Sequence, residues 1–182
     1  MITKPSVRLL RVSFAPRNLP LSAIRPFSTT KSPKSSNRIY TPVRRPDDFS
    51  SYLQLSTSSR RSLITLWTAS YCPTCSTVSP IIQELIESGV GEQEGGVAFC
   101  EVEYDCLDIM SSGLGMTYMI TSMPTLLSFD RGEAQTQTRV VDARKMGDRE
   151  WLKQWIRTEA SRRGGGGGGV GGSALFGGLF GR

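Results

Sequence analysis

The sequence predicts an α/β domain in which a central mixed β-sheet is covered by helices on both faces. Two observations carry this prediction. Short apolar runs, typical of buried strands, alternate with segments whose apolar residues recur at helical spacing. The last two candidate strands are joined by a short turn and followed by a helix, which indicates an antiparallel pair at the end of the sheet.

The first half of the domain is expected to run from a short first strand to a central strand. Residues 38–40 form a short candidate strand. The two Asp residues at 47–48 are suited to cap a helix over 49–55, because carboxylates accept hydrogen bonds from the free N–H groups of a first turn. Residues 56–61 end that helix, and the apolar run 63–67 predicts the central strand.

A long amphipathic helix follows the central strand. Its apolar residues recur at i, i+3, i+4, i+7 and i+8, which places them on one face; they are Val78, Ile81, Ile82, Leu85 and Ile86. Ser88 and Gly89 end this helix, and residues 91–96 form a polar loop. Residues 97–102 are the next candidate strand.

The second half of the domain is expected to end with a hairpin and a helix. A short helix is predicted over 106–110, a strand over 124–129, a turn over 130–133 and a further strand over 137–141. Asp148 is suited to cap a last helix. One side of that helix carries Trp151, Leu152, Trp155 and Ile156.

The N-terminal segment has the composition of a targeting sequence. Residues 1–46 hold ten of the chain's 22 Lys and Arg residues and no acidic residue, together with many Ser residues and scattered apolar ones. The Arg-Pro-Phe-Ser sequence at 25–28 resembles the arginine-directed sites of matrix processing peptidases. We therefore expect a mitochondrial transit peptide over 1–27, a linker over 28–46 and a location in the matrix. The alternative is a basic arm that binds an acidic partner.

Composition also limits the function of the remaining chain. The net charge of +6 comes from the N-terminal segment, so residues 47–163 lack the basic surface that nucleic-acid binding needs. No apolar run reaches the roughly 18 residues of a membrane span. The chain contains no His, which removes His-based catalytic pairs and most zinc and iron ligand sets. Residues 164–182 hold eleven of the nineteen glycines, a composition that predicts a disordered tail.

The motif that carries chemistry is Cys-Pro-Thr-Cys at residues 72–75, where the central strand meets the amphipathic helix. The free N–H groups and positive dipole end of a helix favour a thiolate, so Cys72 is suited to attack a disulfide. Cys75 lies within reach to resolve the mixed disulfide. A four-cysteine zinc site is the alternative, but five residues separate Cys100 from Cys106, so they do not form a second Cys-x-x-Cys.

At these residues the sequence resembles the thioredoxin family. Five residues stand where thioredoxins have an aromatic residue, Ala, Trp and the two cysteines of their W-C-G-P-C motif: Trp67, Ala69, Tyr71, Cys72 and Cys75. A second stretch, residues 118–133, resembles the family's I-P-T sequence, its apolar strand and its K-N-G-E-like turn. The resemblance covers residues 47–163.

The resemblance implies a thioredoxin fold and a set of roles. Cys72 would be the exposed nucleophile and Cys75 the more buried resolving thiol. A cis peptide would join Met123 to Pro124, and the backbone there would pair with the substrate chain. The implied activity is that of an enzyme, a protein-disulfide reductase that contributes to redox homeostasis. It would be a monomer that needs no cofactor or metal besides its redox-active cysteine pair.

The resemblance also implies partners for the cysteine pair. The substrates would be proteins that bear disulfides, and a thioredoxin-reductase-like or thiol electron donor would reduce the pair.

Two departures from the family pattern limit what the resemblance implies. Leu66 stands where thioredoxins keep a buried Asp, and Pro-Thr at 73–74 replaces Gly-Pro. These departures favour an alternative, a catalytically weak binding or adaptor module on the same fold. The motif also resembles that of glutaredoxins, although their Gly-Gly-x-Asp sequence is absent. Cys100 is expected to be a core thiol and Cys106 is a candidate exposed regulatory thiol.

Overall fold

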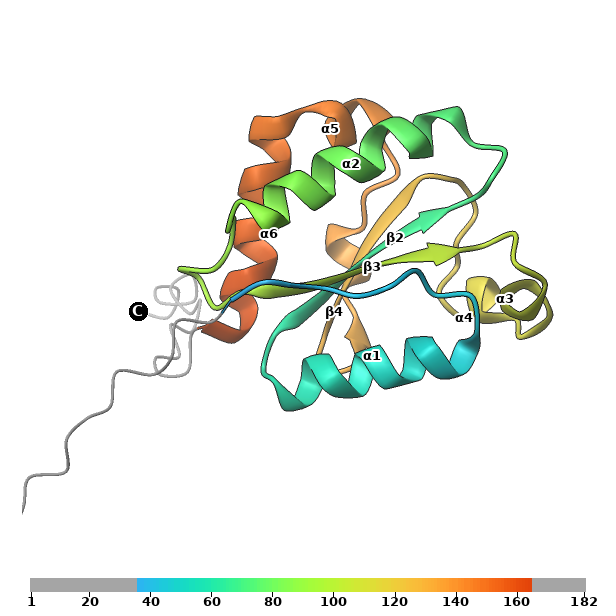
Figure 1. The fold of residues 1–182 in the computed structure, drawn as a ribbon, viewed down its shortest axis with the longest axis horizontal. Coiled ribbons are helices and arrows are strands. Elements are labelled where there is room, and N and C mark those ends of the chain that lie inside the picture. The colour runs from blue at the N-terminus through green and yellow to red at the C-terminus, as the bar shows by residue number, and fades with distance from the viewer. Residues whose placement is uncertain (1–35, 165–182) are drawn as a thin grey trace, which may run out of the picture. The chain divides into compact units, whose positions relative to one another are not determined.

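A mixed β-sheet forms the centre of the protein in a computed structural model that describes residues 36–164 (Figure 1). The sheet has five strands in the order β1-β3-β2-β4-β5. Their bounds are β1 (Arg38–Ile39), β2 (Ser62–Thr68), β3 (Val97–Glu103), β4 (Thr125–Asp130) and β5 (Glu133–Ala134). β3 pairs in parallel with both β1 and β2, whereas β4 is antiparallel to β2 and β5. The predicted mixed sheet is therefore confirmed.

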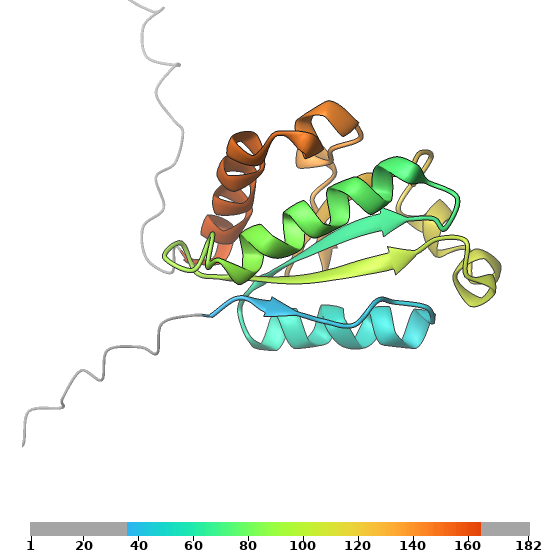
Figure 2. The same cartoon turned by 45° about the horizontal axis from the view of Figure 1, so that its top comes forward.

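Helices cover both faces of this sheet, as predicted. One face carries α1 (Pro46–Ser58), α3 (Leu107–Ser111) and α4 (Leu114–Thr117), and the other carries α2 (Pro73–Glu87), α5 (Ala143–Gly147) and α6 (Arg149–Gly164). Figure 2 shows α1 and α2 on opposite sides of the strands. Every residue of β2 is buried, because both neighbouring strands and both helical layers enclose it.

Two apolar cores result from the alternation of side chains along β2. Ile64 and Leu66 point into the core that α2 and α6 cover. Leu63 and Trp67 point into the core on the other face, beneath α1. In that second core the ring of Phe49 lies 6.0 Å from the ring of Trp67, measured between centroids.

The predicted strand over 137–141 is wrong. β5 ends at Ala134, and a single 3-10 turn, η1 (Thr136–Thr138), follows it. Only Val140 rejoins the sheet, as an isolated bridge to Leu126. The turn is held from outside the sheet, because the indole N–H of Trp155 donates a hydrogen bond to the carbonyl of Thr138. The helix α5 was not predicted.

The helix starts differ from the predictions in one case and agree in another. α1 begins at Pro46 after Arg45, so the Asp residues at 47–48 lie in its first turn and supply no side-chain cap. α6 starts as predicted: the Asp148 carboxylate accepts hydrogen bonds from the N–H groups of Glu150 and Trp151, at 3.0 and 3.2 Å.

Asn37 ties the beginning of the sheet to the end of α2. Its Nδ2 donates to the carbonyls of Ile86 and Val90, both at 2.8 Å, and its Oδ1 accepts from the N–H of Val97 at 3.0 Å. Val43 then makes a parallel bridge to β3. The sheet therefore begins within the segment that we expected to be a linker. The predicted transit peptide, and all but the first residue of the predicted glycine-rich tail, lie outside the described residues.

No helix within residues 36–164 is long and apolar enough to cross a membrane.

Candidate active site

The two cysteines of the motif form a disulfide at the start of α2. Their Cα atoms are 5.3 Å apart. Cys72 is the N-cap residue of the helix, and its Sγ accepts a hydrogen bond from the N–H of Cys75 at 3.1 Å. Pro73 occupies the first helical position, where its missing N–H costs nothing. The positive end of α2 is therefore directed at the sulfur of Cys72.

The two sulfurs differ in their access to solvent. Cys72 is partly exposed, whereas Cys75 is only 3% exposed and packs on the inner side of the helix. Tyr71, next to the pair, is 70% exposed. A partner molecule therefore reaches Cys72 more easily than Cys75.

An open cleft of about 400 Å³ lies beside the disulfide. It lies between the start of α2 and the carboxyl end of β3, and its described lining includes both cysteines and three acidic residues, Glu101, Glu103 and Asp105. No basic residue of the described chain lines it. The wall opposite the cysteines is therefore acidic.

Each acidic residue of the cleft has different partners. Asp105 accepts hydrogen bonds from the N–H and the hydroxyl of Ser70, and these bonds hold the pKa of its carboxyl below the ordinary value. Glu103 forms an ion pair with Arg44 at 2.8 Å. Glu101 accepts hydrogen bonds from the Ser79 hydroxyl and, at 2.6 Å, from Gln83 Nε2.

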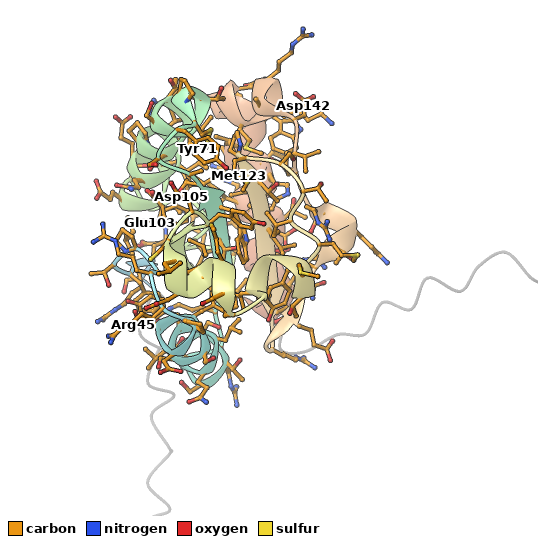
Figure 3. The ribbon with its side chains drawn as sticks, turned by 90° about the vertical axis from the view of Figure 1, so that its right-hand side faces the viewer. Arg45, Tyr71, Glu103, Asp105, Met123 and Asp142 are labelled. Atoms are coloured by element: carbon orange, nitrogen blue, oxygen red, sulfur yellow. A yellow bond between two sulfur atoms is a disulfide. The ribbon has the colours of Figure 1, made fainter. Side chains whose placement is uncertain are left out.

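Sequence reasoning missed these three acidic residues. They follow one another at the carboxyl end of β3 and just beyond it, beside the end of β2 that leads to the cysteines. Because the carboxyl ends of adjacent parallel strands meet at one edge of a sheet, this placement could have been a signal. Figure 3 shows Glu103, Asp105, Tyr71 and Met123 at this end of the sheet.

The peptide bond between Met123 and Pro124 is cis, as the resemblance implied. Pro124 is buried and Met123 is partly buried. The next residue, Thr125, pairs with Trp67 near the end of β2. This pairing puts Met123 at the same end of the sheet as the disulfide. Within residues 36–164, no hydrogen bond reaches the main-chain N–H or C=O of Met123.

The other two cysteines lie apart from the motif. Cys100 is fully buried on β3, and burial raises the pKa of its thiol. Cys106 is partly buried at the N-cap of α3, and its Sγ donates a hydrogen bond to the carbonyl of Arg44 at 3.2 Å. Residues 36–164 contain no group of three or more His, Cys, Asp or Glu side chains that could hold a metal ion.

The fold and the cysteine pair together define a class: a thioredoxin-fold domain with a Cys-x-x-Cys disulfide at the start of the helix that follows the central strand. The sequence model of thioredoxin matches residues 41–158. The chain therefore belongs to the thioredoxin family. A comparison with curated protein sequences gave no match.

Solved thioredoxin structures share the fold at low sequence identity. A thioredoxin from Nicotiana alata is 18% identical with a TM-score of 0.52, over 70% of this chain and 97% of that one. Thioredoxin O1 from Arabidopsis thaliana, in its oxidised state, is 23% identical with a TM-score of 0.51, over 68% and 99% of the two chains. The thioredoxin preprotein of Schistosoma mansoni is 20% identical with a TM-score of 0.52, over 68% and 99%.

Proposed function

We propose that the protein is a thiol-disulfide oxidoreductase that reduces disulfides in other proteins through Cys72 and Cys75. The observation that carries this proposal is the disulfide between a partly exposed cysteine at the N-cap of α2 and a buried one three residues later. An exposed sulfur that receives the positive end of a helix is suited to attack, and a buried partner within bonding distance is suited to resolve.

The reaction proceeds in two exchanges. The Cys72 thiolate attacks one sulfur of the substrate disulfide, so that an S–S bond breaks and the first substrate thiolate leaves. Cys75 then loses its proton and attacks the Sγ of Cys72. The second substrate thiolate leaves, and the Cys72–Cys75 disulfide forms. Two electrons pass from the dithiol to the substrate, and both substrate sulfurs are protonated from solvent.

Met123 and Pro124 are proposed to position the substrate chain. The main-chain N–H and C=O of Met123 have no partner among the described residues, so they are free to pair with an extended substrate segment as a short added strand. The burial of Pro124 fixes the backbone that presents these two groups.

An insulin-reduction assay tests the proposed activity. The wild type is expected to reduce insulin, Cys72→Ser to be inactive, and Cys75→Ser to accumulate mixed disulfides with its substrates. Equal rates for the wild type and Cys72→Ser would refute the proposal. If the wild type is inactive and Cys75→Ser accumulates no mixed disulfide, the protein is the binding module that Leu66 favours.

The electron donor and the direction of transfer form a second part of the proposal. We propose that a thioredoxin-reductase-like enzyme or a small thiol reduces the pair. The reduction potential of the pair tests the direction: a value near about −270 mV agrees with a reductase, and one of about −120 to −180 mV with an oxidant or isomerase. NADPH consumption with thioredoxin reductase tests the donor.

We further propose that the protein works in the mitochondrial matrix as a monomer. The acid-free, Arg- and Ser-rich composition of residues 1–46 supports the location. Protease protection in isolated mitochondria would compare the full chain with one that lacks residues 1–27, and only the full chain is expected to be imported. Light scattering on the purified protein tests the monomer.

A further inference from the structure

The resolving step of the proposed reaction needs a proton acceptor close to Cys75. This sulfur is only 3% exposed, and burial disfavours a thiolate. The N-cap hydrogen bond from α2 goes to the sulfur of Cys72 instead. Leu66, beneath this part of α2, is fully buried and supplies no titratable group.

Three carboxylates of the cleft are candidates for this acceptor, and two of them are engaged elsewhere. Asp105 is held by the N–H and the hydroxyl of Ser70. Glu103 is paired with the guanidinium of Arg44. The bonds from Ser70 lower the pKa of the Asp105 carboxyl and so make it a weaker base. The Glu103 carboxylate is already engaged by a cation.

Glu101 differs because only neutral groups contact its carboxylate. Its Oε1 accepts from Ser79 and Gln83, and no hydrogen bond from the described residues reaches its Oε2. That oxygen is not among the buried, unpaired polar atoms of the described chain, so solvent reaches it. Glu101 also lines the cleft. A carboxylate can take up a proton on an oxygen that accepts no hydrogen bond and is accessible to solvent.

The position of Glu101 brings this carboxylate to the helix that carries Cys75. Glu101 pairs in register with Leu66, so the two side chains share the face of the sheet that α2 covers. Its partner Ser79 lies one helical turn after Cys75, at i+4, on the same side of α2. Cys75, Ser79 and Glu101 all line the cleft.

We propose that Glu101 is the positioning residue that receives the proton of Cys75 during the resolving step, an inference that rests on the proposed function. The proton leaves the Cys75 thiol and passes through the Ser79 hydroxyl or a water of the cleft to the Glu101 carboxylate. The Cys75 thiolate attacks the Sγ of Cys72, the bond from Cys72 to the substrate sulfur breaks, and the departing thiolate takes a proton from solvent.

The test separates the two exchanges with 5,5′-dithiobis(2-nitrobenzoate), which releases one coloured thiolate in each. The reduced protein, with Cys106→Ser to remove the partly buried thiol, is mixed with one equivalent of the reagent. Glu101→Gln keeps an acceptor for Ser79 and Gln83 but removes the base. Near neutral pH its second release is expected to be slower by roughly tenfold to a hundredfold, with the first release unchanged.

The pH profile and a matched control distinguish this role from a structural one. The deficit of Glu101→Gln is expected to shrink as the pH rises, because Cys75 then ionises without help. Glu103→Gln, which removes a neighbouring carboxylate of the same strand and cleft, is expected to match the parent in both releases. An unchanged second release in Glu101→Gln, or an equal loss in Glu103→Gln, would overturn the proposal.

A second variant covers the case in which Glu101→Gln disturbs the fold. In Glu101→Ala, added acetate is expected to accelerate the second release in proportion to its concentration, because the cleft is open to solvent. A normal first release with no response to acetate would overturn the role of Glu101. A parent protein without a second release would refute the proposed function instead.

Discussion

The ring of Tyr104 lies against the backbone of Gly115 so closely that a β-carbon at this glycine would be 2.3 Å from the ring Cε2 and 3.1 Å from Cδ2. Gly115 is buried in α4, and Tyr104 immediately precedes Asp105 at the cleft. This contact packs α4 against the chain that leaves the end of β3. The absence of a side chain at Gly115 is therefore part of how the acidic wall is positioned.

Gly115→Ala is expected to lower the free energy of unfolding by about 1–3 kcal/mol, the usual cost of forcing extra volume into a packed site. Gly147→Ala is the control, because a β-carbon there meets nothing within 4 Å. It is expected to change stability by no more than about 0.5 kcal/mol. Urea unfolding measures both, and equal values would contradict the steric account.

Stability at acidic pH is expected to depend on Asp105. The folded pKa of this carboxyl is lowered, so its contact with Ser70 stabilises the fold above the ordinary Asp pKa of about 3.9. The stabilisation is lost as the pH falls through the lowered folded value. Asp105→Ala should therefore be less stable than the wild type near neutral pH, by about 1 kcal/mol or less because the carboxylate is largely solvated.

The difference in stability between Asp105→Ala and the wild type should narrow as the pH falls through the lowered folded pKa of Asp105. Ser70→Ala removes only the hydroxyl donor and keeps the N–H donor, so its deficit should be the smaller one. Urea unfolding across an acid pH series provides the measurement. A deficit of Asp105→Ala that is the same at every pH would contradict this assignment.

Arg162 is expected to matter for stability because it neutralises a buried carboxylate. The side chain of Glu159 is fully buried, where it accepts hydrogen bonds from the Ser128 hydroxyl and, at 2.7 Å, from Arg162 Nε. Arg162→Ala leaves this charge with a single neutral donor, which should cost roughly 1–3 kcal/mol.

Arg157→Ala on the same helix is the matched control. Arg157 makes an ion pair with Glu94 at 3.8 Å, and both side chains are partly exposed. Its loss should cost about 1 kcal/mol or less, as for other surface pairs. Comparable denaturation midpoints for the two variants would show that burial of Glu159 is not the cause.

Cys72, Cys106 and Cys100 should differ in alkylation rate once the protein is reduced. Cys72 should react with iodoacetamide first, Cys106 more slowly, and Cys100 only when the protein opens, because burial raises the pKa of its thiol and blocks access. Mass spectrometry of labelled peptides over time gives the order. Early labelling of Cys100 in the folded protein would contradict its burial.

The parts of the fold that could be predicted are those with a strong local pattern. The run 63–67 lies inside β2 because a strand enclosed on all sides is largely apolar. The apolar residues of α2 likewise recur at i, i+3 and i+4 because they form its buried face. The segment 137–141 has Thr and Val residues typical of a strand, but the Trp155 indole holds it as a turn. That contact comes from a residue of α6 that lies 17 positions further along the chain.

The cysteine pair could be predicted from the sequence, whereas the cleft beside it could not. Cys72 and Cys75 are three positions apart in the chain and lie at a strand–helix junction that has a local sequence signature. The position of Glu101 depends on the register between β2 and β3. This register places Glu101 next to Leu66, although the two residues are 35 positions apart in the chain. A one-residue shift in that register would turn its side chain to the opposite face. No local sequence pattern specifies the register between β2 and β3.

Asn37 limits where the proposed N-terminal leader could be cut. Its side chain makes three main-chain hydrogen bonds to the end of α2 and the start of β3, each worth roughly 0.5–1.5 kcal/mol. A peptidase that cuts at residues 25–28 leaves all three in place. A cut only a dozen residues later would remove them together with the edge strand. The cleavage site of a leader is therefore constrained by the stability of the domain behind it as well as by the sequence that the peptidase reads.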